Sequence, residues 1–127
     1  ALALQAGQLV QDDTPLAMYQ QPRTPYVAHL LGDANVFEIR QVPQLAVAST
    51  SARWACIRPE CIHLSTPAKA QVWGQVRAWE YLGAYYRMEV EILPGLHWWV
   101  RSSSDRIRRD KTVYLRVKPE DIHFLED

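Results

Sequence analysis

The chain has 127 residues, of which 48% are hydrophobic and 22% are charged. A chain of this length buries roughly two-thirds of the surface that it exposes when unfolded, which excludes a disordered tail and predicts one core or two small lobes. Its 14 basic residues balance its 14 acidic residues, so nucleic acid is not an expected partner. No apolar run approaches the roughly 20 residues of a membrane-spanning helix, so membrane insertion is not expected either.

The first 35 residues predict a β-hairpin followed by two short helices. Residues 1–10 alternate in character on both sides of a Gln-Ala-Gly-Gln turn, as hairpins do. Thr14 and Thr24 each precede a proline, and this pair predicts a threonine N-cap with proline at the first helical position. Pro22 ends the first helix, and Gly32 offers a left-handed terminus for the second.

From Asn35 onward the hydrophobic period becomes two, and β-branched and aromatic residues dominate. About seven strands are expected, separated by prolines, glycines and a serine-rich run, which is typical of a small barrel or sandwich. The expected strands are residues 36–40, 45–48, 54–58, 72–79, 85–92, 96–101 and 112–117. The fold class is therefore mainly β.

An internal repeat links two distant parts of this β region. Residues 57–64, with the sequence Ile-Arg-Pro-Glu-Cys-Ile-His-Leu, recur at residues 117–124 as Val-Lys-Pro-Glu-Asp-Ile-His-Phe. A proline followed by an acid and an apolar-His-apolar alternation predicts a strand that stops, turns and continues on another sheet edge. Two copies imply two related β units packed together.

A few side chains are candidates for contact with a partner. Trp98 and Trp99 are adjacent in one expected strand, so their indoles point to opposite faces and one of them is expected at an interface or rim. Arg106, Arg108 and Arg109, together with Lys111, form a basic cluster, which suits an anion or a partner's acidic face but is also typical of a solvated turn.

Other polar pairs are expected to have only local roles. Arg58 with Glu60, and Lys118 with Glu120, are interpreted as surface ion pairs near the turns, worth under about 1 kcal/mol each. The sequence predicts no catalytic residue and no cofactor-binding residue, because it contains no phosphate-binding glycine loop. Two cysteines indicate reduced thiols rather than a disulfide framework. No metal site is expected, since the candidate ligands lack paired metal-ligand spacing; these candidates are Cys56, Cys61, His63, His97 and His123.

Several segments together resemble the C-terminal part of the ATP-binding subunit of bacterial ABC importers. Residues 6–22 and 26–35 are similar to the family's Gly-x-Ile-x-Gln-x-Gly-Thr-Pro, Tyr-x-x-Pro and Leu-Gly-x-x-Asn motifs, with Asp13 in place of the usual glycine. The two Pro-Glu repeats, and residues 72–83 between them, resemble its regulatory domain, called the TOBE domain. The resemblance implies one or more OB-like barrels built from two related β units.

The resemblance also implies an organisation and a function. Residues 1–35 would be the tail end of the ATPase core and residues 36–127 the regulatory domain, so the chain is expected to be a piece of a larger protein. The parent would use ATP and magnesium, form a homodimer through this domain, bind membrane permease subunits through its ATPase core, and lie in the cytoplasm against the inner face of the membrane.

The transported solute is expected to be a small one, and the junction at residues 31–37 favours iron(III) within an iron(III), polyamine or sulfate class. The alternative function is a free-standing OB-type binding module for an oligonucleotide or a small oxyanion.

Overall fold

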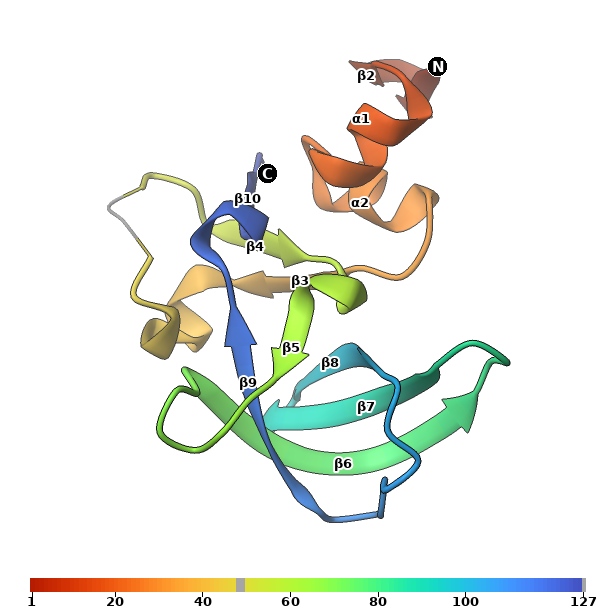
Figure 1. The fold of residues 1–127 in the computed structure, drawn as a ribbon. Helices are drawn as coiled ribbons and strands as arrows, with labels where there is room; N and C mark the ends of the chain where they lie inside the picture. The colour runs from red at the N-terminus through yellow and green to blue at the C-terminus, as the bar shows by residue number, and fades with distance from the viewer. Residues whose placement is uncertain (48–49, 127) are drawn as a thin grey trace.

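The structure is a computed structural model that describes residues 1–47 and 50–126. Within these ranges the strands form three separate antiparallel sheets of two, three and five strands. Figure 1 shows the hairpin and helices of the N-terminal segment (residues 1–34) on one side of the β module, which comprises the remaining described residues. The C-terminal strand ends beside this segment.

The N-terminal segment begins with the predicted hairpin, β1 (Leu2–Gln5) and β2 (Gln8–Asp12). The two turn residues, Ala6 and Gly7, both have positive φ values of 51° and 78°. This geometry is that of the tight turns whose twist matches a two-residue hairpin, and it explains the glycine. The hairpin prediction is confirmed.

Two short helices follow, α1 (Pro15–Gln20) and α2 (Pro25–Leu30), and both begin as predicted. The Thr14 hydroxyl accepts from the Ala17 N–H at 3.2 Å, and the Thr24 hydroxyl accepts from the Val27 N–H at 3.2 Å. Each cap satisfies a backbone donor that has no partner inside its helix. The helices and the hairpin share a small core of Ala3, Met18 and Val27.

The β module contains a three-stranded sheet and a five-stranded sheet. The small sheet has the order β10 (His123–Leu125), β4 (Trp54–Ile57), β3 (Asn35–Glu38). The large sheet has the order β5 (Ile62–Leu64), β9 (Thr112–Val117), β6 (Val72–Tyr81), β7 (Tyr86–Leu93), β8 (Leu96–Ser102). The large sheet curls so strongly that β8 returns to contact β5. The mainly-β, OB-like expectation is confirmed.

The two copies of the repeat cross between these sheets in opposite directions. The first runs from β4 in the small sheet through the 3₁₀ turn Pro59–Cys61 into β5 of the large sheet. The second runs from β9 in the large sheet through the 3₁₀ turn Pro119–Asp121 into β10 of the small sheet. The copies also pair with each other, since β5 lies beside β9 and β10 beside β4. Each copy therefore turns and continues on another sheet edge, as the sequence predicts.

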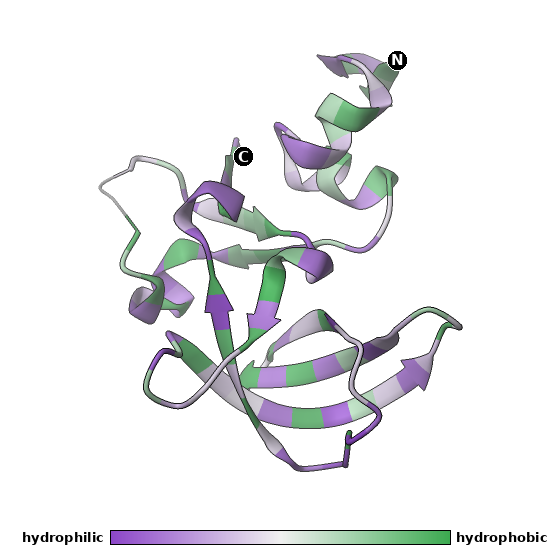
Figure 2. Ribbon diagram, viewed as in Figure 1, coloured by the Kyte–Doolittle hydropathy of each residue, from purple (hydrophilic) through white to green (hydrophobic). Residues whose placement is uncertain are grey.

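One hydrophobic core fills the space between the two sheets. Trp98 is fully buried and packs on Phe37 of β3, with ring centroids 5.1 Å apart. Figure 2 shows the alternation of hydrophobic and hydrophilic residues along β6, β7 and β8 that directs one face of each strand into this core. A third cluster of Ala28, Cys56 and Leu125 joins α2 to the small sheet.

The segment after β3 differs from the prediction. The strand expected at residues 36–40 ends at Glu38 and becomes a 3₁₀ turn, Ile39–Gln41. The strand expected at residues 45–48 is wrong over its described part: Pro43–Leu45 is a second 3₁₀ turn, and Ala46 has a left-handed φ of 50°. Leu45 is apolar because the turn buries its side chain in the core, and not because it belongs to a strand. Ala48 lies outside the described residues.

Candidate functional site

Arg58 holds the N-terminal segment against the β module. It follows β4 and is only 3% exposed. Its Nε donates to the Tyr19 carbonyl at 2.9 Å, and its Nη1 donates to the Ala28 carbonyl at 2.8 Å and the Asp33 carbonyl at 3.0 Å. A guanidinium presents five donors in a rigid fork, so one side chain can join α1, α2 and the linker at once. Tyr19 and Ala28 lie in the C-terminal halves of their helices, where unpaired carbonyls attract a cation.

Tyr19 extends this contact toward the first Pro-Glu turn. The Arg58 guanidinium stacks over the Tyr19 ring at 4.1 Å from its centroid, and the Tyr19 hydroxyl donates to Glu60 Oε2 at 2.5 Å. Burial, and then the hydrogen bond to the Glu60 carboxylate, raise the pKa of Tyr19 to about 12. These three side chains line a cleft of about 330 Å³ between the N-terminal segment and the β module. We call Tyr19, Arg58 and Glu60 the Arg58 contact.

The linker between α2 and β3 is fixed by a second set of contacts, to β7 and β8. Asn35 is the first residue of β3, and its side chain accepts from the Trp99 N–H at 2.7 Å and donates to the Trp99 carbonyl at 2.8 Å. Arg87 binds Asp33 at 2.7 Å and Glu80 at 2.7 Å. Its guanidinium also lies over the Trp99 ring, 4.3 Å from the centroid. The linker is therefore tied to the β module at Asp33 and at its junction with β3.

The sequence-predicted contact residues fall in three different environments. Trp98 is fully buried, so its selection as a partner contact is wrong: its indole is a core side chain packed on Phe37. Trp99 is half-buried beneath Arg87. The three arginines are exposed on the β8–β9 loop, at the end of the β module opposite the N-terminal segment (Figure 1). The structure therefore does not bring the tryptophans and the arginines together as one site.

Some of the residues considered as metal ligands are neighbours: His123 pairs with Cys56 across β10 and β4, and Cys61 and His123 line the same cleft. Among residues 1–47 and 50–126, no group of three or more His, Cys, Asp or Glu side chains is placed to hold a metal ion. Cys56 is buried, and burial raises the pKa of its thiol to about 11. Burial also lowers the pKa of His123. Cys56 is therefore enclosed by packing, whereas His123 is half-buried and lines the cleft beside the Arg58 contact.

The interpretation of Arg58 as half of a surface ion pair with Glu60 is wrong. Arg58 bonds to three backbone carbonyls of the N-terminal segment, and Glu60 instead accepts from Tyr19. The one signal available in the sequence is the difference between the two copies, which have arginine at position 58 and lysine at position 118. Lys118 is exposed.

The two curled sheets and their crossing repeats define a small OB-like β domain, and comparison with known proteins specifies its family. Residues 55–125 match the family described as "TOBE domain". This match covers more than half of the chain, and the chain belongs to the TOBE domain family.

The curated relatives are longer proteins. The chain is 37% identical over 89 residues to the "Uncharacterized ABC transporter ATP-binding protein YdcT" of Escherichia coli K12, which covers 70% of this chain and 26% of that protein. It is 25% identical to the "Spermidine/putrescine import ATP-binding protein PotA" of Borreliella afzelii, over 98% of this chain and 39% of that protein. The PotA protein of Clostridioides difficile is 23% identical, over 94% of this chain and 38% of its own length.

The chain thus spans between a quarter and two-fifths of the length of these relatives. In the described part of the chain, none of the helices has the length and apolar character needed to cross a bilayer.

Proposed function

We propose that this chain is the regulatory and dimerisation region of the ATP-binding subunit of an ABC importer. Residues 1–35 would then complete the ATPase core, and residues 36–127 would form the regulatory domain. The family match and the relatives named as ABC transporter ATP-binding proteins support this assignment. The parent would hydrolyse ATP with magnesium at a site outside this chain, and the subunit would act in the cytoplasm beside membrane permeases.

The observation that carries this proposal is a set of exposed leucines on the N-terminal segment. They are between 38% and 64% exposed, whereas the segment's own core consists of only three buried side chains. Leu4 and Leu9 are directly paired across the hairpin, so they lie on one face. An apolar surface of this kind is typical of one that packs against further protein. We call these residues the leucine surface: Leu2, Leu4, Leu9, Leu16, Leu30 and Leu31.

Regulation in this proposal works by contact rather than by chemistry. A movement of the ATPase core would reach the N-terminal segment through its leucine surface. The Arg58 contact and the linker contacts of Asn35 and Arg87 would then carry that movement into the β module. The same path would transmit a signal from the β module back to the nucleotide site, since coupling between sites is reciprocal.

The coupling role is tested with the full-length subunit assembled with its permeases in proteoliposomes. Arg58→Lys keeps the charge but loses the fork that joins three carbonyls. We expect fewer solute molecules imported per ATP hydrolysed, and a smaller loss in the free energy of unfolding of the isolated chain than a substitution that removes the charge. Lys118→Arg, at the exposed equivalent position, is the matched control. An unchanged ratio in Arg58→Lys would contradict the role.

We propose a polyamine as the transported solute. Four relatives carry the name spermidine/putrescine import protein, and this favours a polyamine over the iron(III) that the junction motif favours. The proteoliposomes decide between the two, with putrescine, spermidine and iron(III) each presented by the cognate binding protein. Import of iron(III) without import of either polyamine would overturn this part of the proposal.

The dimer is tested separately, by sedimentation equilibrium of the full-length subunit without nucleotide. We expect a dimer that persists when the β module is present and is lost when residues 36–127 are removed. A monomer at high micromolar concentration would count against dimerisation through this domain.

A further inference from the structure

The loop between β8 and β9 (residues 103–111) is exposed but held in one conformation. The Asp110 N–H donates to the Val76 carbonyl at 2.7 Å, and the Val76 N–H donates to the Lys111 carbonyl at 2.9 Å. At the other end, the Ser102 hydroxyl accepts from the Ser104 N–H at 3.1 Å. Ile107, in the middle of the loop, packs against the main core. The backbone of the loop is therefore fixed at both ends and in the middle, which reduces the ordering cost of binding.

The loop carries an excess of positive charge, with four cations against Asp105 and Asp110. Asp110 is bound by Arg77, which also pairs with Glu91 at 2.9 Å, so its carboxylate is already engaged. Within the described ranges, no carboxylate lies within ion-pair distance of Arg106, Arg108 or Arg109. The chain as a whole has no net charge, so this is a local excess. It produces a local positive potential that attracts anions.

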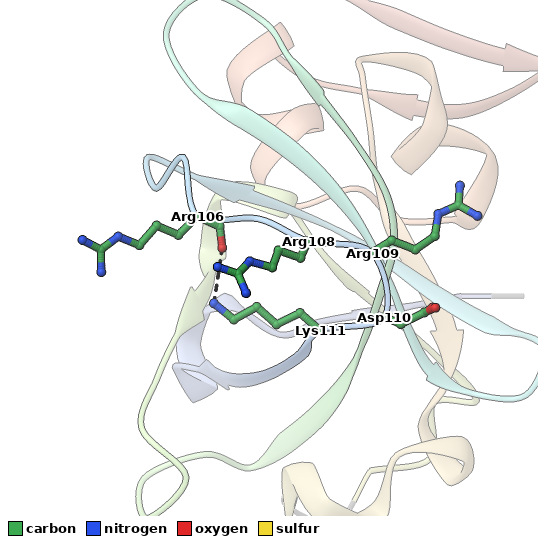
Figure 3. A pocket seen from close by; sticks show the side chains of 5 residues that line it. All are labelled: Arg106, Arg108, Arg109, Asp110 and Lys111. Carbon is green, nitrogen blue, oxygen red and sulfur yellow. Dashed lines mark hydrogen bonds between the residues drawn. The ribbon is translucent and has the colours of Figure 1, made fainter.

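The side chains also have a defined arrangement around a cleft. Arg106, Arg108, Arg109, Asp110 and Lys111 line a cleft of about 430 Å³. Figure 3 shows Arg106, Arg108 and Lys111 extending to one side of the loop, and Arg109 and Asp110 extending to the other. Lys111 Nζ donates to the Arg106 carbonyl at 3.3 Å, and this hydrogen bond keeps the lysine on the same side of the loop as Arg106 and Arg108.

We propose that Arg106, Arg108 and Lys111 form a binding site for a small phosphate-type anion, either pyrophosphate or the phosphate groups of a nucleotide. Arginine forks bind phosphate oxygens through paired hydrogen bonds, and lysine adds a point charge. An anion with two or more charges relieves the mutual repulsion of three cations that share one side of the loop. A single carboxylate supplies less charge, and an acidic protein segment would more naturally use both sides of the loop, including Arg109.

The site lies at the opposite end of the β module from the N-terminal segment. It is therefore separate from the Arg58 contact and from the ATPase site assigned to the parent protein. The 127-residue chain is the better material for the test, because it lacks the phosphate-binding glycine loop of an ATPase that would bind nucleotide independently.

The experiment is isothermal titration of the 127-residue chain with pyrophosphate, ADP and succinate at constant ionic strength set by sodium chloride. We expect saturable one-to-one binding of pyrophosphate and weaker binding of succinate. Arg108→Gln and Lys111→Gln should each weaken pyrophosphate binding by about tenfold or more. Arg109→Gln removes the same charge on the other side of the loop and should change the affinity by less than about twofold. Equal affinity for ADP and pyrophosphate would assign the site to the phosphate groups alone, and tighter ADP binding would assign it to a nucleotide.

Four results would overturn the proposal. The first is an equal loss of affinity in all three variants, which would indicate diffuse charge attraction rather than a site. The second is succinate binding as tight as pyrophosphate binding. The third is no pyrophosphate binding up to millimolar concentration. The fourth is binding of a poly-glutamate peptide that depends on Arg109 while pyrophosphate does not bind, which would assign the loop to an acidic protein partner.

Discussion

Arg58 and Lys118 occupy equivalent positions in the two copies of the repeat, but only Arg58 is buried. Replacing Arg58 by leucine leaves the carbonyls of Tyr19, Ala28 and Asp33 without their donors. Because buried polar groups without partners are costly, we expect Arg58→Leu to lower the free energy of unfolding by about 2–4 kcal/mol. Urea denaturation of the isolated chain measures this change.

Lys118→Leu is the matched control for that measurement. Lys118 is exposed, so its replacement should change the free energy of unfolding by less than about 0.5 kcal/mol. Equal effects of the two substitutions would mean that the carbonyl contacts of Arg58 contribute nothing to stability.

Tyr19 gives the Arg58 contact a dependence on alkaline pH. Its pKa is raised to about 12 by burial and by Glu60, from about 10 in an unfolded chain. Since the folded state favours the neutral phenol, the stabilisation is complete below pH 10 and is lost as the pH rises toward 12. We expect the difference in stability between the wild-type chain and Tyr19→Phe to change over that window and to be constant from pH 7 to pH 9. A constant difference throughout would contradict the assigned pKa.

At the residue scale, the sequence predicts local roles better than long-range ones. The threonine caps depend only on neighbouring residues, so Thr14 and Thr24 are predictable. The Trp98-Trp99 pair predicts one buried and one accessible indole, but alternation alone cannot say which one faces the core. The partners of Arg58 come from two helices and a linker far away in sequence, so no local pattern indicates them.

Gly74 is required at the element scale, where β6 passes close to β7. A Cβ at this position would lie 2.3 Å from the Glu91 carbonyl oxygen and 2.8 Å from a methyl carbon of Val90. Because a backbone atom cannot move aside as a side-chain end can, we expect Gly74→Ala to destabilise the chain by about 1–3 kcal/mol.

Thermal and urea unfolding measure the effect of Gly74→Ala. Gln75→Ala, at the next and exposed position of β6, is the control and should be close to neutral. A neutral Gly74→Ala would show that the two strands can separate without cost at this point.

Strands in which buried and exposed residues alternate are predictable from the sequence. Loop segments that bury single apolar side chains in the core are not. β6, β7, β8 and β9 bury every second residue over much of their length, and their expected positions are confirmed to within a few residues. Residues 39–45 also contain spaced apolar side chains, but they form two 3₁₀ turns that place Val42 and Leu45 in the core. A short apolar run can be a strand or a loop anchor, and Pro43 is the only local hint.

At the scale of the whole molecule, the leucine surface of the N-terminal segment should add to the self-association of the isolated chain, beyond the dimer contact proposed for the β module. Replacing both Leu4 and Leu9 by glutamine removes two paired, exposed apolar side chains. We expect sedimentation velocity to show less concentration-dependent association in this variant, because exposed apolar surface drives association.

Leu64→Gln, on the β module, is the control for that experiment. Leu64 is 45% exposed but lies apart from the leucine surface, so its replacement should leave self-association unchanged. If the double variant associates as strongly as the wild-type chain, the leucine surface is not the contact.

The internal repeat predicts two related β units but not how they combine. Each unit contributes one strand to each sheet, and the direction of crossing reverses between the copies. The sequence carries no signal for that reversal, because the same eight-residue pattern suits both directions.

This reversal has a consequence for synthesis on the ribosome. β9 is the central partner of both β5 and β6, and β10 covers an edge of β4. Neither sheet can close until residues 112–125 have left the exit tunnel, although most of the strands emerge much earlier. Contacts this distant along the chain form slowly. The nascent domain therefore has open strand edges until residues 112–125 emerge and pair with both sheets.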